Sequence, residues 1–183
     1  MTDEVFNLPP EMIAIARRVI DENREAGRTV AVAESCTGGL VTASLTAIAG
    51  SSDVFTQGFV TYSDDAKVRM LGVSPDIIDT FGSVSVATAW AMALGALENS
   101  DADIAIAVTG IAGPGGGTAT KPVGTVVFAR ARRGQDADLT YADRKMFDLK
   151  DRGAIRRQAT LCALELLSPS EDEGRVGCVV PGA

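Results

Sequence analysis

The sequence contains no histidine among its 183 residues. This absence excludes the Ser-His-Asp triad, the Cys-His pair and every metal site that depends on imidazole ligands. A hydrolase with this composition therefore needs a different general base. Cysteine and acidic residues show no clustered metal-ligand spacing either, so we expect neither a metal ion nor a cofactor.

Cysteine is scarce, with only Cys36, Cys162 and Cys178. The odd number and the lack of a C-x-x-C motif argue against a disulfide framework, so we expect three reduced thiols in a cytoplasmic protein. No apolar run approaches the ~18–20 residues that cross a bilayer, and the first residues are acidic where a signal peptide is basic. We therefore expect no membrane association.

Basic residues are fewer than acidic ones, with 17 Lys and Arg against 24 Asp and Glu and a net charge of −7. Nucleic-acid binding depends on clustered basic residues, so no nucleic-acid partner is expected. The 46% apolar content is that of a globular protein, and the length suits about one domain. We assign that domain to 1–168 and expect a disordered acidic tail at 169–183.

Apolar residues at helical spacing alternate along the chain with short apolar strands. Helices are predicted at about 10–27, 38–47, 64–72, 85–97 and 151–167, and strands at about 29–33, 55–62, 104–108, 123–129 and 139–147. The last two strands flank a polar turn and should form an antiparallel hairpin. This order predicts an α/β protein, a three-layer α/β/α sandwich with a mixed, mostly parallel sheet. The apolar stripe around Trp90 makes a homodimer the expected assembly.

Polar segments follow three of the predicted strands. They begin at Ala33, Thr61 and Thr109, where each apolar run ends. Ligands of open α/β sheets bind outside the carboxyl ends of the parallel strands, so we expect these segments to meet in one pocket. The glycine-rich stretch 110–121 matches neither a Walker A loop nor a dinucleotide fingerprint. It is either a backbone surface for a ligand or a plain connecting loop.

Ser35 lies on the predicted turn from strand to helix, where its hydroxyl is exposed and the following N–H groups can stabilise an oxyanion. It is a candidate nucleophile. The alternative is that Ser35 or Thr37 merely caps the helix entered at Gly38. Cys36 is a competing nucleophile without a histidine partner.

A serine nucleophile without histidine needs another base, and a desolvated lysine is the usual substitute. Lys67 lies one turn into the helix after Tyr62, so it can lean over the strand end while Tyr62 positions or relays the proton. Each also has an ordinary interpretation, an exposed helix lysine and a packed aromatic. Arg152 and Arg156 share one helix face and suit a phosphate or carboxylate, or they are solvated surface groups. Glu34 is a charge partner, a ligand acceptor or a structural salt bridge.

Several motifs together resemble the CinA C-terminal domain family, the nicotinamide-nucleotide amidases. The resemblance spans about 10–167 and comprises Ala33-Glu34-Ser35-Cys36-Thr37-Gly38-Gly39, Gly50-Ser51-Ser52, Gly58-Phe59-Val60-Thr61-Tyr62-Ser63 with Lys67 following, Gly82-Ser83-Val84-Ser85, Thr109-Gly110-Ile111-Ala112-Gly113-Pro114 and Lys121-Pro122-Val123-Gly124-Thr125-Val126. Relatives commonly have Gly-Asp-Arg where this chain has Lys150-Asp151-Arg152.

The resemblance implies deamidation of nicotinamide mononucleotide to nicotinate mononucleotide and ammonia in pyridine-nucleotide salvage, with no metal. It implies Ser35 as nucleophile, Lys67 as general base and Tyr62 as its partner. The expected substrate contacts are Glu34, Thr37, Gly38, Thr109, Gly110, Gly113 and Arg152, with Arg152 on the 5′-phosphate. Many relatives carry a preceding domain, and the short N-terminus here implies the stand-alone form. The alternative is a non-catalytic regulatory module that binds a nucleotide in the same pocket.

Overall fold

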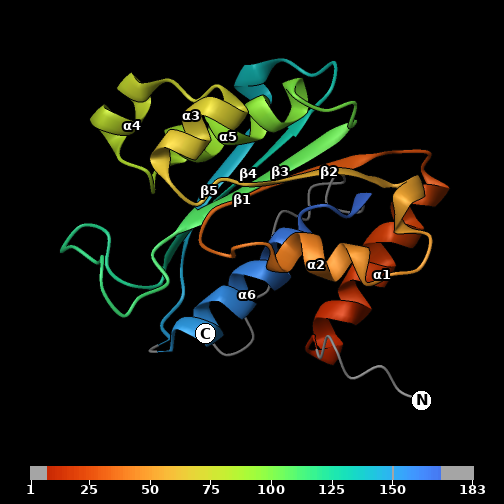
Figure 1. The fold of residues 1–183 in the computed structure, drawn as a ribbon, viewed down its shortest axis with the longest axis horizontal. Coiled ribbons are helices and arrows are strands. Elements are labelled where there is room, and N and C mark those ends of the chain that lie inside the picture. The colour runs from red at the N-terminus through yellow and green to blue at the C-terminus, as the bar shows by residue number, and fades with distance from the viewer. Residues whose placement is uncertain (1–7, 150, 170–183) are drawn as a thin grey trace.

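The computed structural model describes residues 8–149 and 151–169 (Figure 1). Apart from Pro169, the predicted tail at 169–183 lies outside these residues. The elements in chain order are α1 (Pro10–Glu25), β1 (Val30–Glu34), α2 (Leu40–Thr46), η1 (Ser51–Asp53), β2 (Phe55–Val60), α3 (Asp64–Leu71), α4 (Pro75–Phe81), α5 (Val86–Glu98), β3 (Ile104–Gly110), β4 (Thr125–Arg132), η2 (Ala137–Leu139), β5 (Tyr141–Met146) and α6 (Arg152–Glu165).

The strands form one mixed sheet in the order β2-β1-β3-β4-β5. β1 pairs in parallel with β2 and β3, whereas β4 pairs antiparallel with β3 and β5. The α/β class, the mixed sheet and the final hairpin are therefore confirmed. The expectation of a mostly parallel sheet is wrong for the pairings, because β3 reaches β4 through a loop without the helical crossover that a parallel neighbour requires.

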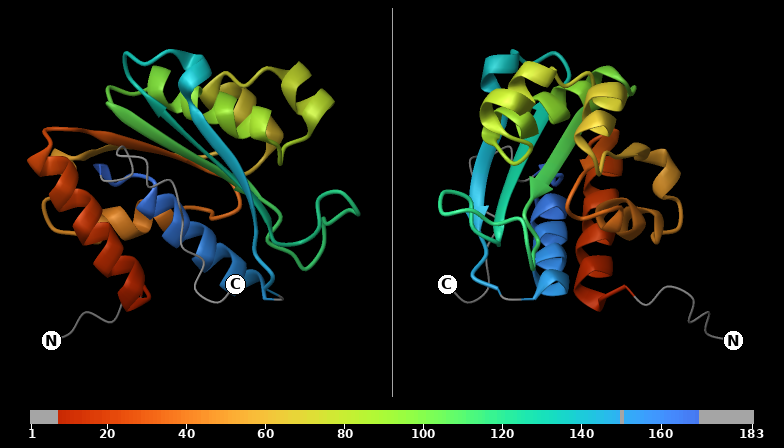
Figure 2. Two further views of the ribbon diagram at one scale, coloured as in Figure 1. Left: turned by 180° about the vertical axis from the view of Figure 1, so that it is seen from behind. Right: turned by 60° about the vertical axis from the view of Figure 1, so that its left-hand side comes forward.

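The sheet has one face of large aliphatic side chains and one face of alanines. In β1 and β3, Val30, Val32, Ile104, Ile106 and Val108 belong to one hydrophobic cluster, and Ala31, Ala33, Ala105 and Ala107 belong to the other. Figure 2 shows α1, α2 and α6 on one side of the sheet and α3, α4 and α5 on the opposite side. Because side chains alternate along a strand, this sequence pattern selects which helices approach each face.

Helix α5 covers the alanine face. Ala89, Ala93 and Leu97 are buried there, and the Trp90 indole N–H donates to the Ala137 carbonyl at 3.1 Å. The homodimer expectation depended on this apolar stripe, which packs against the sheet of the same chain. Helix α4 was not predicted, because its seven residues are too few for a helical repeat to stand out, although Ile78 packs against the core.

Two sequence expectations concern the cysteines and the membrane. Cys36 is a free thiol, whereas Cys162 is disulfide-bonded. The expectation of three reduced thiols is therefore wrong for Cys162, because the spacing of cysteines along a sequence does not show their bonding state. Cys178 lies outside the described residues. Within residues 8–149 and 151–169, no helix is both long and apolar enough to cross a bilayer.

We expect Gly95→Ala to destabilise the fold. A Cβ at this position of α5 would lie 1.9 Å from the Leu71 carbonyl oxygen at the end of α3. Such overpacking costs about 1–3 kcal/mol, which corresponds to a fall in Tm of roughly 2–12 °C for a chain of this size. Gly115→Ala is the control, because nothing lies within 4 Å of its added Cβ. Thermal unfolding of the two variants measures the difference, and equal Tm values would contradict the close approach of α5 to α3.

Candidate active site

The three polar segments that follow β1, β2 and β3 meet at one cavity of about 260 Å³. The predicted convergence is therefore confirmed, and it follows from three adjacent parallel strands whose carboxyl ends share one edge of the sheet. The lining residues are Ser35, Cys36, Tyr62, Asp64, Lys67, Ser83, Val84, Thr109, Gly110, Ala112 and Arg152.

Glu34 holds the turn that follows β1. Its carboxylate is fully buried and accepts backbone hydrogen bonds from Gly39 at 2.9 Å, Val41 at 3.2 Å and Thr42 at 2.8 Å. These donors belong to the first turn of α2, whose N–H groups have no partner within the helix. Glu34 was expected to contact substrate, but its carboxylate caps α2 and does not line the cavity.

Arg156 holds the same turn from the opposite side. Its Nε donates to the Cys36 carbonyl at 3.2 Å, and its Nη2 donates to the Thr37 carbonyl at 2.8 Å. Gly38 has φ +61°, and a Cβ there would lie 3.3 Å from that guanidinium. Thr37 and Gly38 were expected beside the substrate; neither is among the residues that line the cavity, and both lie against the Arg156 guanidinium.

Ser35 and Cys36 both reach the cavity. The Ser35 N–H donates to the Val108 carbonyl at 2.9 Å, which ties the start of the turn to β3. Burial raises the pKa of the Cys36 thiol to about 12, and the neighbouring N–H groups of Cys36 and Thr37 offset this only in part. At neutral pH Cys36 is therefore protonated, and a thiolate nucleophile is disfavoured.

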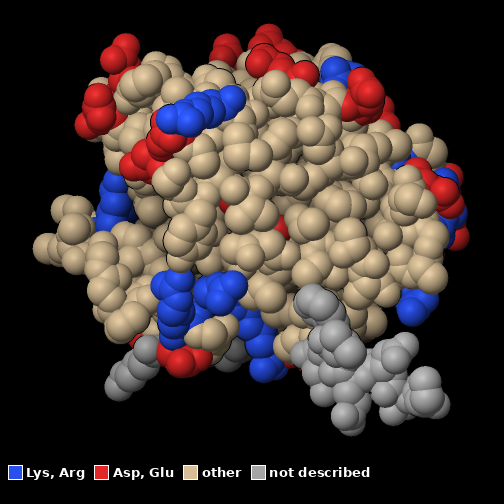
Figure 3. Space-filling view, viewed as in Figure 1, with Lys and Arg blue, Asp and Glu red and all other residues tan. Residues whose placement is uncertain are grey.

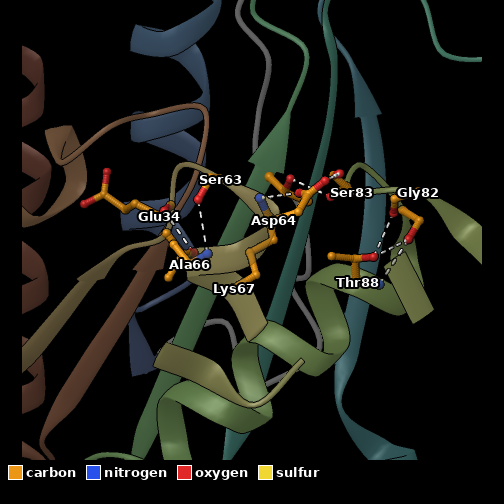
Figure 4. A network of polar contacts seen from close by, with 11 residues as sticks. Glu34, Ser63, Asp64, Ala66, Lys67, Gly82, Ser83 and Thr88 are labelled. Carbon is orange, nitrogen blue, oxygen red and sulfur yellow. Dashed lines mark hydrogen bonds and ion pairs between the residues drawn. The ribbon is translucent and has the colours of Figure 1, made fainter. Parts of the chain in front are cut away.

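Lys67 is buried, with 2% of its side chain exposed, and its Nζ donates to Asp64 Oδ1 at 3.2 Å. The other oxygen of Asp64 accepts from Ser83 Oγ at 2.6 Å (Figure 4). Burial acts to raise the pKa of Asp64, but the hydrogen bonds from Ser83 and Lys67 and the charge of Lys67 outweigh it, so this pKa lies below its ordinary value. Among the described residues, no hydrogen bond joins Lys67 to Ser35, although both line the cavity.

Arg152 lies at the mouth of the cavity. Its Nη1 donates to the Gly113 carbonyl and its Nη2 to the Tyr62 hydroxyl, both at 2.7 Å. Tyr62 is thus bonded to Arg152 and makes no hydrogen bond to Lys67 among the described residues. In the view of Figure 3, Lys and Arg side chains gather in the lower part of the molecule, where Figure 1 places α6. The first two turns of α6 contain Arg152, Arg156 and Arg157.

Thr109 and the nearby glycines shape the wall. The Thr109 hydroxyl donates to the Ser83 carbonyl at 2.9 Å, so it orients the segment that bears Ser83. A Cβ at Gly110 would lie 2.9 Å from the Thr125 carbonyl oxygen and 3.1 Å from Cys36 Sγ. Gly113 is buried, does not line the cavity and bonds to Arg152. Of these two glycines, only Gly110 lines the cavity, and a side chain at this position would collide with Thr125 and Cys36.

Asp64 and Ser83 were not among the predicted site residues. Asp64 follows Ser63 at the start of a helix, a position typical of a capping group. Ser83 lies in a segment that no predicted strand leads into, so only the motif resemblance pointed to it. In the part of the chain that the structure describes, no group of three or more His, Cys, Asp and Glu residues could hold a metal ion.

Comparison with known proteins gives one family over most of the chain. The model of the CinA C-terminal domain matches residues 12–170. The nicotinamide-nucleotide amidohydrolase PncC of Shigella flexneri is 47% identical over 158 residues, which cover 86% of this chain and 93% of that protein. A CinA-like protein of Chlorobium phaeovibrioides is 56% identical over 120 residues, 66% of this chain, but the match spans only 28% of that longer protein.

Solved structures show the same fold. The competence/damage-inducible protein CihA of Agrobacterium tumefaciens superposes with a TM-score of 0.83 at 48% sequence identity, covering 87% of this chain and 95% of that chain. The competence damage-inducible protein A of Klebsiella pneumoniae superposes with a TM-score of 0.81 at 36% identity, covering 91% and 99%.

We expect Cys36 to resist alkylation in the native protein. With a pKa of about 12 raised by burial, its thiolate fraction at pH 8 is about 10⁻⁴, against roughly a quarter for an ordinary cysteine. The rate should rise about tenfold for each pH unit below 12, because only the thiolate reacts. Mass spectrometry of the Cys36 peptide after iodoacetamide treatment, with and without urea, measures this. Rapid native labelling at pH 8 would contradict the burial of the thiol.

Proposed function

The chain belongs to the CinA C-terminal domain family, and on that basis we propose that it hydrolyses the carboxamide of nicotinamide mononucleotide to nicotinate mononucleotide and ammonia. The observation that carries the proposal is the presence of Ser35 and the buried Lys67 in one cavity. The substrate is suggested by the name of the Shigella flexneri relative, 93% of which the similarity covers.

Amide hydrolysis needs an activated nucleophile, a site for the oxyanion and a proton for the leaving amine. In the proposed cycle Ser35 Oγ attacks the carboxamide carbon, and the C–N bond breaks with loss of ammonia. Water then cleaves the ester on Ser35 and releases the carboxylate. The N–H groups of Cys36 and Thr37 are the proposed oxyanion donors. The Arg156 contact with the Cys36 carbonyl holds the peptide unit that also bears the Thr37 N–H.

Lys67 is the proposed general base and the proton donor to ammonia. Its burial removes the solvent that would otherwise compete for its amine, and its Nζ is hydrogen-bonded to Asp64 at 3.2 Å. Lys67 and Ser35 line the same cavity, so we assign to this amine the proton transfers to and from Ser35 Oγ. Tyr62 lines the cavity and is hydrogen-bonded to Arg152, and we assign it the role of orienting the bound substrate beside Lys67.

Arg152 is the proposed ligand of the 5′-phosphate. It is the first residue of α6, where the helix N-terminus adds partial positive charge. Its guanidinium donates hydrogen bonds to two neutral oxygens, the Tyr62 hydroxyl and the Gly113 carbonyl. A phosphate accepts stronger, charge-assisted hydrogen bonds than these and can displace them.

The decisive experiment is ammonia release from nicotinamide mononucleotide. Wild-type protein should release ammonia, and Ser35→Ala should lower kcat by at least about a thousandfold with an unchanged Tm, because removal of a nucleophile abolishes the covalent step. Cys36→Ala is the neighbouring control and should retain the reaction. If Cys36→Ala lost ammonia release while Ser35→Ala retained it, the nucleophile would be Cys36 and the assignment of Ser35 would be wrong. Nucleotide binding without ammonia release by the wild type would favour the non-catalytic regulatory module.

Arg152→Ala tests the phosphate contact. This substitution should weaken binding of the mononucleotide by about 1.5–3 kcal/mol, which is the usual contribution of a hydrogen bond to a charged group. KM should therefore rise by about one to two decades. Nicotinamide riboside lacks the phosphate and should be processed equally by both proteins. Arg157→Ala is the matched control on the same helix, because Arg157 pairs with Glu11 and does not line the cavity. Equal losses with mononucleotide and riboside would show that Arg152 does not act through phosphate.

A further inference from the structure

Asp64 is the one carboxylate among the described residues that line the cavity. Its two oxygens bond to Lys67 at 3.2 Å and to Ser83 at 2.6 Å, so it joins the first turn of α3 to the segment between α4 and α5 (Figure 4). The cation of this pair is buried, whereas half of the Asp64 side chain is exposed. The pair thus exposes its anionic member and buries its cationic one.

Few other charged or titratable groups surround the pair. The Lys121 ammonium lies beside Gly82 and is bonded to the Phe81 carbonyl at 2.6 Å. From the turn after β1 comes the Cys36 thiol, which burial keeps protonated. From the end of β2 comes the Tyr62 hydroxyl, and from α6 comes the Arg152 guanidinium, which is bonded to it. Glu34 is close, but its carboxylate is bonded to the N–H groups of α2. Asp64 is therefore the group that balances the charge of Lys67.

A buried ammonium with no counter-ion binds an anion strongly, because the low dielectric of the interior strengthens the attraction. The proposed reaction makes such an anion at this place: R–CONH₂ and water give R–COO⁻ and NH₄⁺. If the position beside Lys67 were vacant, the product carboxylate would occupy it. Asp64 already occupies it and also repels a second carboxylate.

Asp64 also suits the neutral substrate. A carboxylate has about four acceptor sites, and Lys67 and Ser83 use two of them. The carboxamide of the substrate has an NH₂ group that donates, whereas the product carboxylate has no donor. We propose that Asp64 is a specificity-determining residue that favours the carboxamide over its own acid product. This inference rests on the proposed amidase function.

The test is the affinity of the product, which the protein does not turn over. Calorimetric titration with nicotinate mononucleotide should show at least tenfold tighter binding to Asp64→Asn than to wild type, a difference of about 1.4 kcal/mol. The affinity for nicotinamide mononucleotide should not rise from the Ser35→Ala variant to the double variant that combines Ser35→Ala with Asp64→Asn, because Asn offers the carboxamide fewer acceptor sites than the carboxylate does. The added product affinity should weaken with salt, as an ionic attraction does.

Asp65→Asn is the matched control. Asp65 lies in the same turn of α3, but it pairs with Arg69 at 2.9 Å and does not line the cavity, so this variant should bind both nucleotides as wild type does. Asp64→Glu keeps the charge and should retain weak product binding even if Asp64→Asn alters the stability. Binding of both nucleotides with an unchanged ratio in Asp64→Asn would overturn this inference alone. Failure of the wild type to bind either nucleotide would overturn the proposed function and this inference with it.

Discussion

The site depends on a turn of five residues, 35–39, whose backbone is held from two sides. The buried Glu34 carboxylate accepts hydrogen bonds from N–H groups at the start of α2. The Arg156 guanidinium donates hydrogen bonds to the carbonyls of Cys36 and Thr37. Buried backbone groups without partners are costly, so these contacts leave the turn little freedom. The clamp thereby fixes the backbone of the turn that carries Ser35.

The charge distribution of the cavity follows from what surrounds this turn. Burial keeps Cys36 neutral, the α2 cap withdraws the Glu34 carboxylate from the cavity, and the pair of Lys67 and Asp64 is balanced within itself. Arg152 then supplies the positive charge at the mouth. A neutral reacting group and an anionic remainder, such as the carboxamide and phosphate of a mononucleotide, match this arrangement of charge.

The sheet positions the two halves of the site relative to each other. Its alanine face allows α5 to approach closely, and α3 packs on α5 at the Leu71 carbonyl beside Gly95. Lys67 and Asp64 therefore come from the layer on one face, whereas Arg152 and Arg156 come from α6 on the other (Figure 2). The carboxyl edge of β1, β2 and β3 is where these two layers meet.

Local sequence signals determined much of this protein. Alternation of apolar residues predicted the strands and their faces, capping residues and glycines predicted most helix limits, and polar segments after three strands predicted their meeting point. The parallel pairing of β1, β2 and β3 forces those strand ends together, so Ser35, Tyr62, Lys67 and Thr109 could be expected at one cavity from the chain alone.

Only the tertiary structure decided what each polar group contacts. Glu34, Thr37 and Gly38 precede or follow Ser35 closely, yet none of them is among the residues that line the cavity, because Glu34 caps α2 and the other two lie against Arg156. Asp64 and Ser83 are 19 residues apart and meet because α3 and the segment before α5 converge above the sheet. Spacing along a chain specifies the face of a helix or strand, but a side chain's partner depends on which distant elements pack against it.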